Sequence, residues 1–156
     1  MVLQWKRLSG ESGHDAGRAL LRQMYREYTG QEMPEILYAP AGKPYFAHGP
    51  HFSISHTKKH VFCALSDKPI GLDAEEKDRE VKLRLAEKIL SPVEFEQYEN
   101  AADKRETLLR FWVLKEAAAK CSGEGLKGFP NQTEFSLENA PIQEIDGCLV
   151  VVIEEI

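Results

Sequence analysis

The sequence has few cysteines and no long apolar segment. Cys63, Cys121 and Cys148 lie far apart and are odd in number, which argues against a disulfide framework, and no C-x-x-C spacing suggests a zinc site. The opening residues MVLQWKRLSGESG contain no apolar signal core. The longest apolar run, Cys148–Ile153, is too short to span a bilayer. We therefore expect a reduced, cytoplasmic protein without a membrane partner.

Blocks of like charge are also absent. The net charge of the 156 residues is −5, and no charged run has the length of a nucleic-acid-binding or membrane-binding tail. A hydrophobic content of 42% with 29% charged residues is a globular composition. No P-loop, dinucleotide fingerprint or supported Ser-His-Asp arrangement occurs. An anionic substrate must therefore be bound locally, by individual lysines or by a metal ion.

The patterning of the chain predicts a mixed α+β fold with antiparallel strand pairs. Asp15 is expected to cap a helix that runs to about residue 28, and four prolines predict a loop over 33–50. Val81, Leu85 and Ile89 form a helical ridge, a new helix is expected to begin at the capping box of Ser91 and Glu94, and a longer helix covers about 106–121. Strands are expected at 52–55, 60–66, 70–75, 133–138 and 148–154. Two turns, at 67–69 and at Asp146-Gly147, predict hairpins between the strands that flank them.

Two acidic residues lie close together in the strand expected at 70–75. Side chains alternate between the faces of a strand, so Asp73 and Glu75 share one face and Leu72 and Ala74 the other. Neighbouring carboxylates repel each other unless a cation lies between them, and oxygen ligands suit Mg²⁺. Taken alone, a solvent-facing strand edge is the simpler explanation.

A third carboxylate lies in the middle of the helix expected at 106–121. The segment 110–120 is apolar around its circumference, which indicates a buried helix. Glu116 follows Trp112 by one turn and precedes Lys120 by one turn. A buried carboxylate needs a partner. That partner is either Lys120, in a structural ion pair, or a metal ion shared with Asp73 and Glu75, and the pattern leaves both open.

The residues after the proline-rich loop offer groups that bind phosphate. Ser53, Ser55 and His56 supply hydroxyls and an imidazole, and two lysines follow at 58 and 59. A single histidine near a turn is, however, more often an ordinary surface residue.

Five segments now occur in a recognisable order: GKPY at 42–45, FSISH at 52–56, IGLDAE at 70–75, FWVLKEAAAK at 111–120 and GEGL at 123–126. Together they resemble the 4′-phosphopantetheinyl transferases of the surfactin-synthetase-activating (Sfp) type, of which the chain looks like a shortened member. The resemblance spans about residues 14–138. G-x-D-x-E alone is common, whereas the ordered set is specific.

The resemblance implies a reaction. Such enzymes transfer the 4′-phosphopantetheine arm of coenzyme A to a serine hydroxyl of an apo carrier protein and release 3′,5′-ADP, as in holo-acyl-carrier-protein synthases. It also implies that Mg²⁺ binds beside the pyrophosphate to the residues matching Asp73, Glu75 and Glu116. Cations there neutralise charge on the leaving phosphate.

The resemblance further implies roles for single residues. Glu116, directly or through a metal-bound water, is expected to take the serine proton, with Lys120 and Asp73 completing the catalytic set. Contacts to coenzyme A are expected from Lys43, Ser55, His56, Lys115 and Lys120.

Larger members of the family consist of two similar α+β halves with the site at their junction. The resemblance therefore implies a 4′-phosphopantetheinyl transferase-like fold with an N-terminal half at 1–66 that contacts coenzyme A phosphates. The C-terminal half at 67–156 holds the metal carboxylates, and together they form one compact pseudo-two-fold monomer. The short N-terminal stretch lacks positions for basic residues at the adenosine phosphate. Arg18 or Arg22 can replace them, or can form a solvated stripe.

The implied carrier proteins are acidic, so Arg84 and Lys88 are candidates for docking, although such pairs are usually solvated faces. No nucleic-acid partner is expected. Two other functions remain open: a non-catalytic module that binds coenzyme A or a carrier protein, and another Mg²⁺-dependent phosphohydrolase or nucleotidyl transferase. The presence of all three carboxylates disfavours the first, and Lys43 and the phosphate loop fit the second less well.

Overall fold

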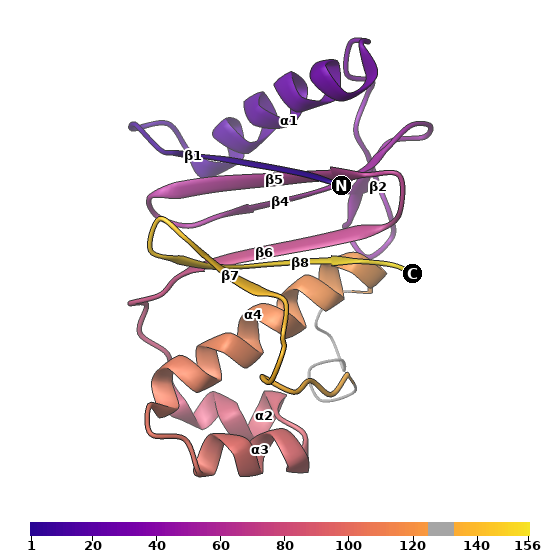
Figure 1. Ribbon diagram of the computed structural model, residues 1–156. Helices are drawn as coiled ribbons and strands as arrows, with labels where there is room; N and C mark the ends of the chain where they lie inside the picture. Colours follow the sequence, from indigo (N-terminus) through magenta and orange to yellow (C-terminus); the bar gives the residue numbers. More distant parts are fainter. Residues whose placement is uncertain (125–132) are drawn as a thin grey trace.

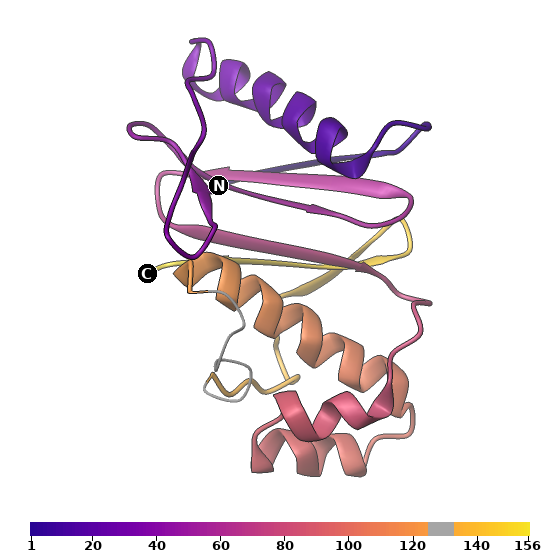
Figure 2. The same ribbon diagram turned by 180° about the vertical axis from the view of Figure 1, so that it is seen from behind.

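The computed structural model describes residues 1–124 and 133–156 (Figure 1). Two three-stranded antiparallel sheets lie between two long helices, so that the layers follow the order helix α1, first sheet, second sheet, helix α4. The same order is seen from behind (Figure 2). The mixed α+β class with small antiparallel sheets is confirmed. No helix in the described part of the chain is long and apolar enough to cross a membrane.

The first sheet has the strand order β1-β5-β4, from β1 (Val2–Arg7), β5 (His60–Ser66) and β4 (His51–His56). Its outer face packs against α1 (Gly13–Thr29) through a core that includes Leu21 and Met24. The helix cap lies three residues earlier than expected, at Ser12, whose side chain accepts a hydrogen bond from the Asp15 backbone N–H at 3.0 Å. The prediction that Asp15 itself is the cap is wrong.

The second sheet has the strand order β6-β8-β7, from β6 (Ile70–Glu76), β8 (Cys148–Glu154) and β7 (Ile142–Ile145). The expected strand at 133–138 is wrong, since the described residues there form no strand and β7 lies further along the chain. The expected turn is confirmed: Asp146 and Gly147 have φ angles of 48° and 81°, which suit a tight hairpin between β7 and β8.

The predicted hairpin of 60–66 with 70–75 is also wrong, although both strands exist at those positions. Strand β5 lies between β1 and β4, and β6 pairs with β8. The turn at 67–69 therefore joins two sheets. Tertiary packing places the strands in different sheets, because the two sheets pack face to face. They bury a common apolar core that includes Phe62, Leu72 and Val150.

Edge strands β4 and β6 lie side by side, and serine hydroxyls join them. The hydroxyl of Ser53 accepts a hydrogen bond from the Leu72 N–H, and that of Ser55 accepts one from the Ala74 N–H, each at 3.0 Å. These bonds satisfy backbone donors on β6 that no strand pairs with on that side. The junction of the two sheets thus places the SISH segment next to the acidic strand.

Three short helical elements cover the far side of α4 (Lys104–Ser122), namely η1 (Leu83–Leu85), α2 (Ala86–Ile89) and α3 (Pro92–Glu99). The capping box of Ser91 and Glu94 at the start of α3 is confirmed in both of its hydrogen bonds. A two-stranded ribbon of β2 (Leu37–Tyr38) and β3 (Pro44–Tyr45) interrupts the loop expected at 33–50. The last two residues of the GEGL segment, 125 and 126, lie outside the described residues.

Candidate active site

The site begins with the close packing of strand β6 on helix α4. A Cβ atom at Gly71 would lie 2.0 Å from the Ala117 carbonyl oxygen, so only glycine allows this approach. Because strand residues alternate, Asp73 and Glu75 share the helix-facing side with Gly71. Leu72 and Ala74 face the core between the sheets instead. The expected division of this strand into an acidic and an apolar face holds.

The three carboxylates line one cavity of about 400 Å³. Asp73 and Glu75 reach it from β6, and Glu116 reaches it from α4. Its remaining wall comes from residues of β4, α4 and the segment after β6, namely Ile54, Ser55, His56, Ala74, Arg79, Trp112 and Lys120. The structure therefore brings together six residues that the sequence singled out, from both halves of the chain.

Asp73 is the most buried of the three acids, with an exposed fraction of 5%. Its Oδ1 atom accepts hydrogen bonds from Lys120 Nζ at 3.3 Å and from Ser55 Oγ at 3.4 Å. Its Oδ2 atom is buried and has no partner among the described residues. Burial raises the pKa of Asp73 to about 7, while Lys120 opposes that rise and Glu75 and Glu116 add to it. An orphaned oxygen among three acids is an arrangement that a bound cation would complete.

The neighbouring acids differ from Asp73 in their partners. Glu75 pairs with Arg79 at 2.8 Å, whereas Glu116 forms no ion pair within the described residues. Burial raises the pKa of Glu116, against the influence of Lys120. The oxygens of the three acids do not all lie within 4.8 Å of one another. For all three acids to bind one ion, their side chains must therefore rotate toward one another, and Glu75 would break its ion pair with Arg79.

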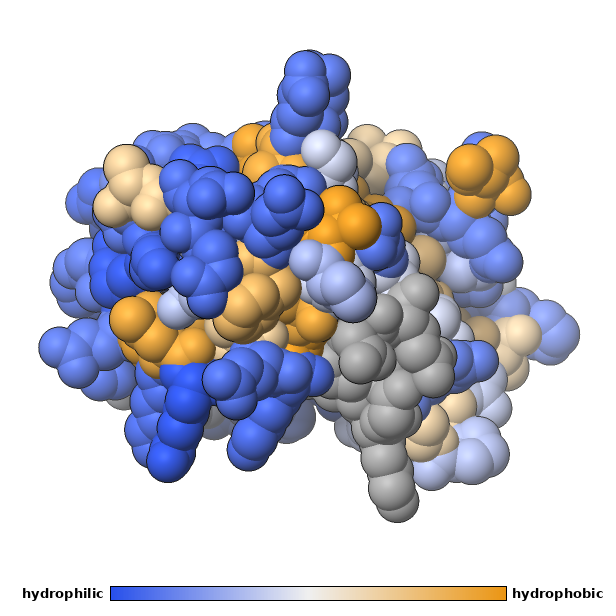
Figure 3. Space-filling view, turned by 90° about the horizontal axis from the view of Figure 1, so that it is seen from below, coloured by the Kyte–Doolittle hydropathy of each residue, from blue (hydrophilic) through white to orange (hydrophobic). Residues whose placement is uncertain are grey.

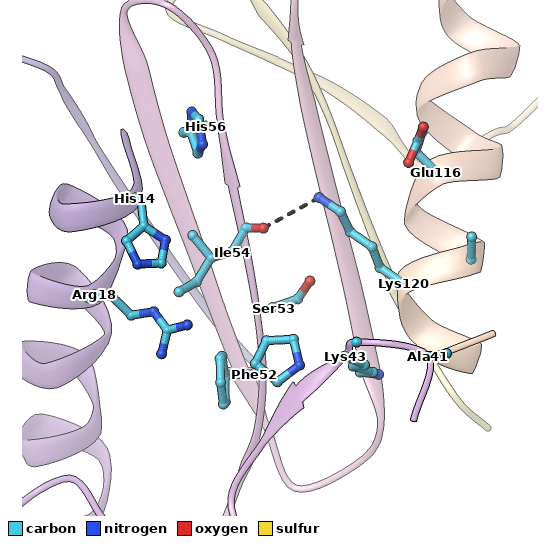
Figure 4. Close-up of a pocket in the computed structure, with 14 residues that line it drawn as sticks. His14, Arg18, Ala41, Lys43, Phe52, Ser53, Ile54, His56, Glu116 and Lys120 are labelled. Carbon is cyan, nitrogen blue, oxygen red and sulfur yellow. Dashed lines mark hydrogen bonds between the residues drawn. The ribbon is translucent and has the colours of Figure 1, made fainter. Parts of the chain in front are cut away.

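Lys120 connects the two edge strands at this cavity. Its ammonium donates to the Leu72 carbonyl at 2.9 Å and to the Ile54 carbonyl at 3.4 Å, the bond drawn in Figure 4. The ion pair of Lys120 is with Asp73 rather than with Glu116. Of the two partners that the sequence left open for Glu116, the structure therefore does not contain the ion pair with Lys120.

A second cavity of about 350 Å³ adjoins the first and shares Ile54, His56, Glu116 and Lys120 with it. Figure 4 shows that His14 and Arg18 reach it from α1. Three cationic or ionisable nitrogen groups, those of His14, Arg18 and Lys43, thus line this side of the site. The arrangement suits an anion that extends away from the three acids.

Two of these groups have partners already. The Arg18 guanidinium donates to the Tyr38 hydroxyl at 2.6 Å. The Lys43 ammonium donates to the Cys121 carbonyl at 2.9 Å and to the Ile70 carbonyl at 3.3 Å, and burial lowers its pKa. Lys43 therefore lies at the C-terminal end of α4, where carbonyl oxygens are free to accept.

Among the predicted site residues, Lys115 lines neither of the two cavities. Its side chain has no exposed surface and pairs at 2.8 Å with Glu94, which is equally buried. Its ammonium also donates to the Thr133 carbonyl at 2.9 Å. Lys115, which was expected to contact coenzyme A, therefore lines neither cavity, because Lys115 and Lys120 lie five residues apart, or about 140° around the helix axis.

Sequence reasoning missed three residues that line the cavities: His14, Arg79 and Trp112. Trp112 precedes Glu116 by one helical turn, and that spacing was a usable signal. His14 lies one residue after the start of α1, and the position of that start depends on the Ser12 cap. Nothing in the sequence around Arg79 indicates that its guanidinium reaches Glu75.

Comparison with known proteins gives a consistent result. The family model of the 4′-phosphopantetheinyl transferase superfamily matches residues 69–148, just over half of the chain. The chain is 31% identical to the 4′-phosphopantetheinyl transferase gsp of Aneurinibacillus migulanus, over 72% of this chain and 51% of that protein. It is 33% identical to the 4′-phosphopantetheinyl transferase Sfp of Bacillus subtilis (strain 168), over 70% of this chain and 51% of that protein. It is 31% identical to the 4′-phosphopantetheinyl transferase HetI of Nostoc sp., over 71% of this chain and 52% of that protein. The chain spans about half the length of these relatives.

Proposed function

Because the chain belongs to the 4′-phosphopantetheinyl transferase superfamily, with Sfp among its relatives, we propose that it transfers 4′-phosphopantetheine from coenzyme A to a carrier protein. The acceptor is a serine hydroxyl of an apo acyl or peptidyl carrier protein, and 3′,5′-ADP is released. We further propose that the reaction depends on Mg²⁺ held by Asp73, Glu75 and Glu116.

The observation that carries this proposal is the state of Asp73. A carboxylate oxygen without exposed surface or hydrogen-bond partner is costly unless a cation completes its surroundings. The donor set consists of three carboxylates without a sulfur or nitrogen ligand, which suits a hard ion such as Mg²⁺. Bound there, the ion supplies charge neutralisation for the pyrophosphate oxygens.

The side chains around the ion site can bind and orient the coenzyme. The ammonium of Lys120 lies between the acidic cavity and its neighbour, where it offsets negative charge on the bridging phosphate. His14, Arg18 and His56 line the path away from the acids and suit the further phosphate of the coenzyme. Lys43 joins them if its ammonium turns from the end of α4.

Glu116 is the candidate base for the carrier serine. Its carboxylate lines both cavities and forms no ion pair within the described residues, so one oxygen is free to accept a proton. Its raised pKa makes it a stronger base than an exposed glutamate. In this scheme the serine oxygen attacks the phosphorus of the pantetheine phosphate, the P–O bond to the 3′,5′-ADP oxygen breaks, and the serine proton goes to Glu116.

We propose that coenzyme binding and metal binding are divided between the two halves of the chain, as the sequence suggested. Residues 1–66 supply His14, Arg18 and Lys43 for the coenzyme, and residues 67–156 supply the metal carboxylates. Since one chain contains both parts, a monomer suffices for the proposed site.

An acidic carrier has a candidate docking surface beside α2. Arg84 and Lys88 are exposed there, together with the apolar side chains of Leu83 and Val93, which are 47% and 51% exposed. The lower face of the molecule has hydrophobic side chains set among hydrophilic ones (Figure 3). Such a mixture suits a partner with acidic and apolar groups side by side.

Incubation with an apo carrier protein, coenzyme A and Mg²⁺ tests the proposal. The expected result is a mass increase of the carrier equal to one phosphopantetheine group. Tight coenzyme binding without any increment across several apo carriers would instead indicate a binding module. Cleavage of the coenzyme pyrophosphate without a carrier would indicate a hydrolase.

The carboxylates are tested in the same assay. Asp73→Asn should lower turnover at least about a hundredfold, the scale of losing one key electrostatic group. Glu116→Gln should have a similar effect. Glu106→Gln, on the same helix, should leave turnover of the folded protein within about twofold, because Glu106 lines neither cavity. Near-normal turnover of Asp73→Asn at low Mg²⁺ would refute its assignment.

A further inference from the structure

A second group of metal-binding side chains lies on the opposite face of strand β6 from the proposed active site. His60 at the start of β5, Glu76 at the end of β6 and Cys148 at the start of β8 converge at one end of the core between the sheets. Glu76 and Cys148 are direct partners in the strand register. Asp73 and Glu75 face helix α4, so this cluster is separate from the cavity described above.

The three donor atoms lie close enough together to reach one metal ion. Cys148 Sγ lies 3.4 Å from His60 Nδ1 and 3.5 Å from Glu76 Oε2, and His60 Nδ1 lies 3.0 Å from Glu76 Oε1. Among the described residues, this is the group whose ligand atoms all lie within 4.8 Å of one another. In a tetrahedral zinc site, neighbouring ligand atoms are separated by roughly 3.3–3.7 Å, given the usual zinc–ligand bond lengths. The two distances from Cys148 Sγ fall in this range, whereas His60 Nδ1 and Glu76 Oε1, which share a hydrogen bond, would have to separate slightly when the ion binds.

The residues behind the cluster are arranged as they are around metal-binding histidines. His60 Nε2 contacts Asp146 Oδ2 at 2.7 Å, which fixes the ring with Nδ1 directed at Glu76 and Cys148. A carboxylate on the second ring nitrogen is the usual support of a metal-bound histidine. The Thr57 hydroxyl donates to Glu76 Oε1 at 2.6 Å and orients the carboxylate in the same way.

Access and charge also favour an ion. An open cavity of about 750 Å³ is lined by His60, Glu76 and Asp146 and provides an entry path. Cys148 and His60 are buried, with exposed fractions of 0% and 4%. One thiolate and one carboxylate balance the charge of a divalent ion, and Asp146 is already paired with Arg7 at 2.7 Å.

We propose that His60, Glu76 and Cys148 form a second, structural metal site for a divalent ion of the zinc class, with a water from the open cavity as fourth ligand. Binding displaces two protons, the thiol proton that Cys148 donates to Glu76 and the Nδ1 proton that His60 donates to Glu76, and both leave to solvent. The ion would join β5 of the first sheet to β6 and β8 of the second, and so fix the end of the junction between the two halves.

Cobalt absorption tests the site on the full chain. The protein is stripped with a chelator and titrated with Co²⁺ in excess Mg²⁺, which saturates the oxygen-only site. A thiolate-to-cobalt charge-transfer band is expected in the unmodified protein and in Cys63→Ser and Cys121→Ser, and it should be absent in Cys148→Ser. No band in the unmodified protein, or a band that persists in Cys148→Ser, overturns the proposal.

Zinc affinity gives a second measurement. Asp146→Asn keeps a residue that tolerates the positive φ of 48° at this turn and removes the charge behind His60. Its zinc affinity, measured by competition with a chromophoric chelator, should fall about 10-fold to 100-fold. Equal affinities would show that His60 does not bind the metal through this arrangement.

A third measurement does not need the cysteine variant to fold. Native mass spectrometry of the unmodified protein in excess Mg²⁺ should detect one zinc ion per chain, and Glu76→Gln should lose it. Absence of bound zinc at saturating concentration means that the cluster is a hydrogen-bonded network alone. Carrier modification in Mg²⁺ is assayed separately, so failure of the zinc site leaves the transferase proposal standing.

Discussion

At the scale of one residue, the environment of Asp73 opposes the stability of the fold. Its carboxylate is held in a nearly solvent-free position beside two other acids, and one of its oxygens has no partner. Lys120 compensates for only part of this, since the pKa of Asp73 still rises to about 7. A side chain kept under these conditions points to function rather than to folding.

The pH dependence of stability follows from that raised pKa. A carboxyl group whose folded-state pKa exceeds its ordinary value of 3.8 stabilises the fold fully only below that value, and its contribution is lost as the pH rises to about 7. In chelator, Asp73→Asn should therefore become more stable than the unmodified protein above pH 7, by about 1–3 kcal/mol.

Urea unfolding of both proteins across this pH range measures the difference in unfolding free energy. Taking the difference cancels the titration of all other groups that the two proteins share. Added Mg²⁺ should narrow the gap at high pH by binding the ionised carboxylate. A difference that does not change with pH would contradict the assigned environment of Asp73.

Lys115 makes the opposite case, because its charge belongs to the core. Lys115→Met should destabilise the protein by about 3–5 kcal/mol, since Glu94 would remain buried without its partner. Carrier modification per folded molecule should stay within about twofold, because Lys115 reaches neither cavity. Denaturant unfolding and turnover corrected for the folded fraction check the two statements. A large loss of turnover in fully folded Lys115→Met would show that Lys115 does act in the reaction.

At the scale of secondary-structure elements, the site depends on how closely α4 lies on β6. Gly71 permits that contact, since a Cβ atom there would lie 2.3 Å from the Cys121 N atom as well as meeting Ala117. Ser53 and Ser55 fix the other side of β6 through its backbone. The position of Asp73 between Glu116 and Ser55 is therefore set by a glycine that allows close packing and by two serines that hold the β6 backbone.

Gly71→Ala tests this dependence. The added methyl group must push α4 away from β6, at a cost of about 1–3 kcal/mol for overpacking, and should lower turnover because Glu116 and Lys120 move with the helix. Gly30→Ala is the control, since its Cβ would meet no atom within 4 Å and only the φ of 75° is strained. Thermal unfolding and carrier modification measure both. Unchanged turnover in Gly71→Ala would show that the helix position is not critical.

The sequence predicted most elements but mispaired two of them. Alternation and turn residues identify the strands at 60–66 and 70–75, and the short turn between them predicts a hairpin. The structure assigns them to different sheets, because β6 meets a complementary partner in β8, 72 residues along the chain from Glu76 to Cys148. Local pattern holds no information about a partner so far away.

At the scale of the whole molecule, the two sheets share a core, and we propose that each sheet belongs to one half of the chain. Phe62 and Ala64 of the first half pack with Ile70, Leu72 and Val150 of the second. An apolar interface of this kind cannot be exposed in one half without cost to the other, so we expect the halves to unfold together.

The two tryptophans allow a direct test, since Trp5 lies in β1 of the first half and Trp112 in α4 of the second. In Trp112→Phe the fluorescence reports the first half, and in Trp5→Phe it reports the second. For each variant, the fluorescence midpoint in urea should coincide with the midpoint from far-ultraviolet circular dichroism. Two separated transitions in either variant would show that the halves are independent folding units.

The sequence by itself determined the α+β class, most helices and strands, the alternation that directs Asp73 and Glu75 to one face, and the spacing of Glu116 and Lys120. These features depend on local periodicity and on residues close together in the chain. The tertiary structure decided that β5 and β6 belong to two sheets, that Lys115 turns to Glu94, and that His14 and Arg79 join the cavities. It also brought His60, Glu76 and Cys148 together. Such outcomes depend on which distant surfaces fit and bury one another, and no short-range pattern encodes that choice.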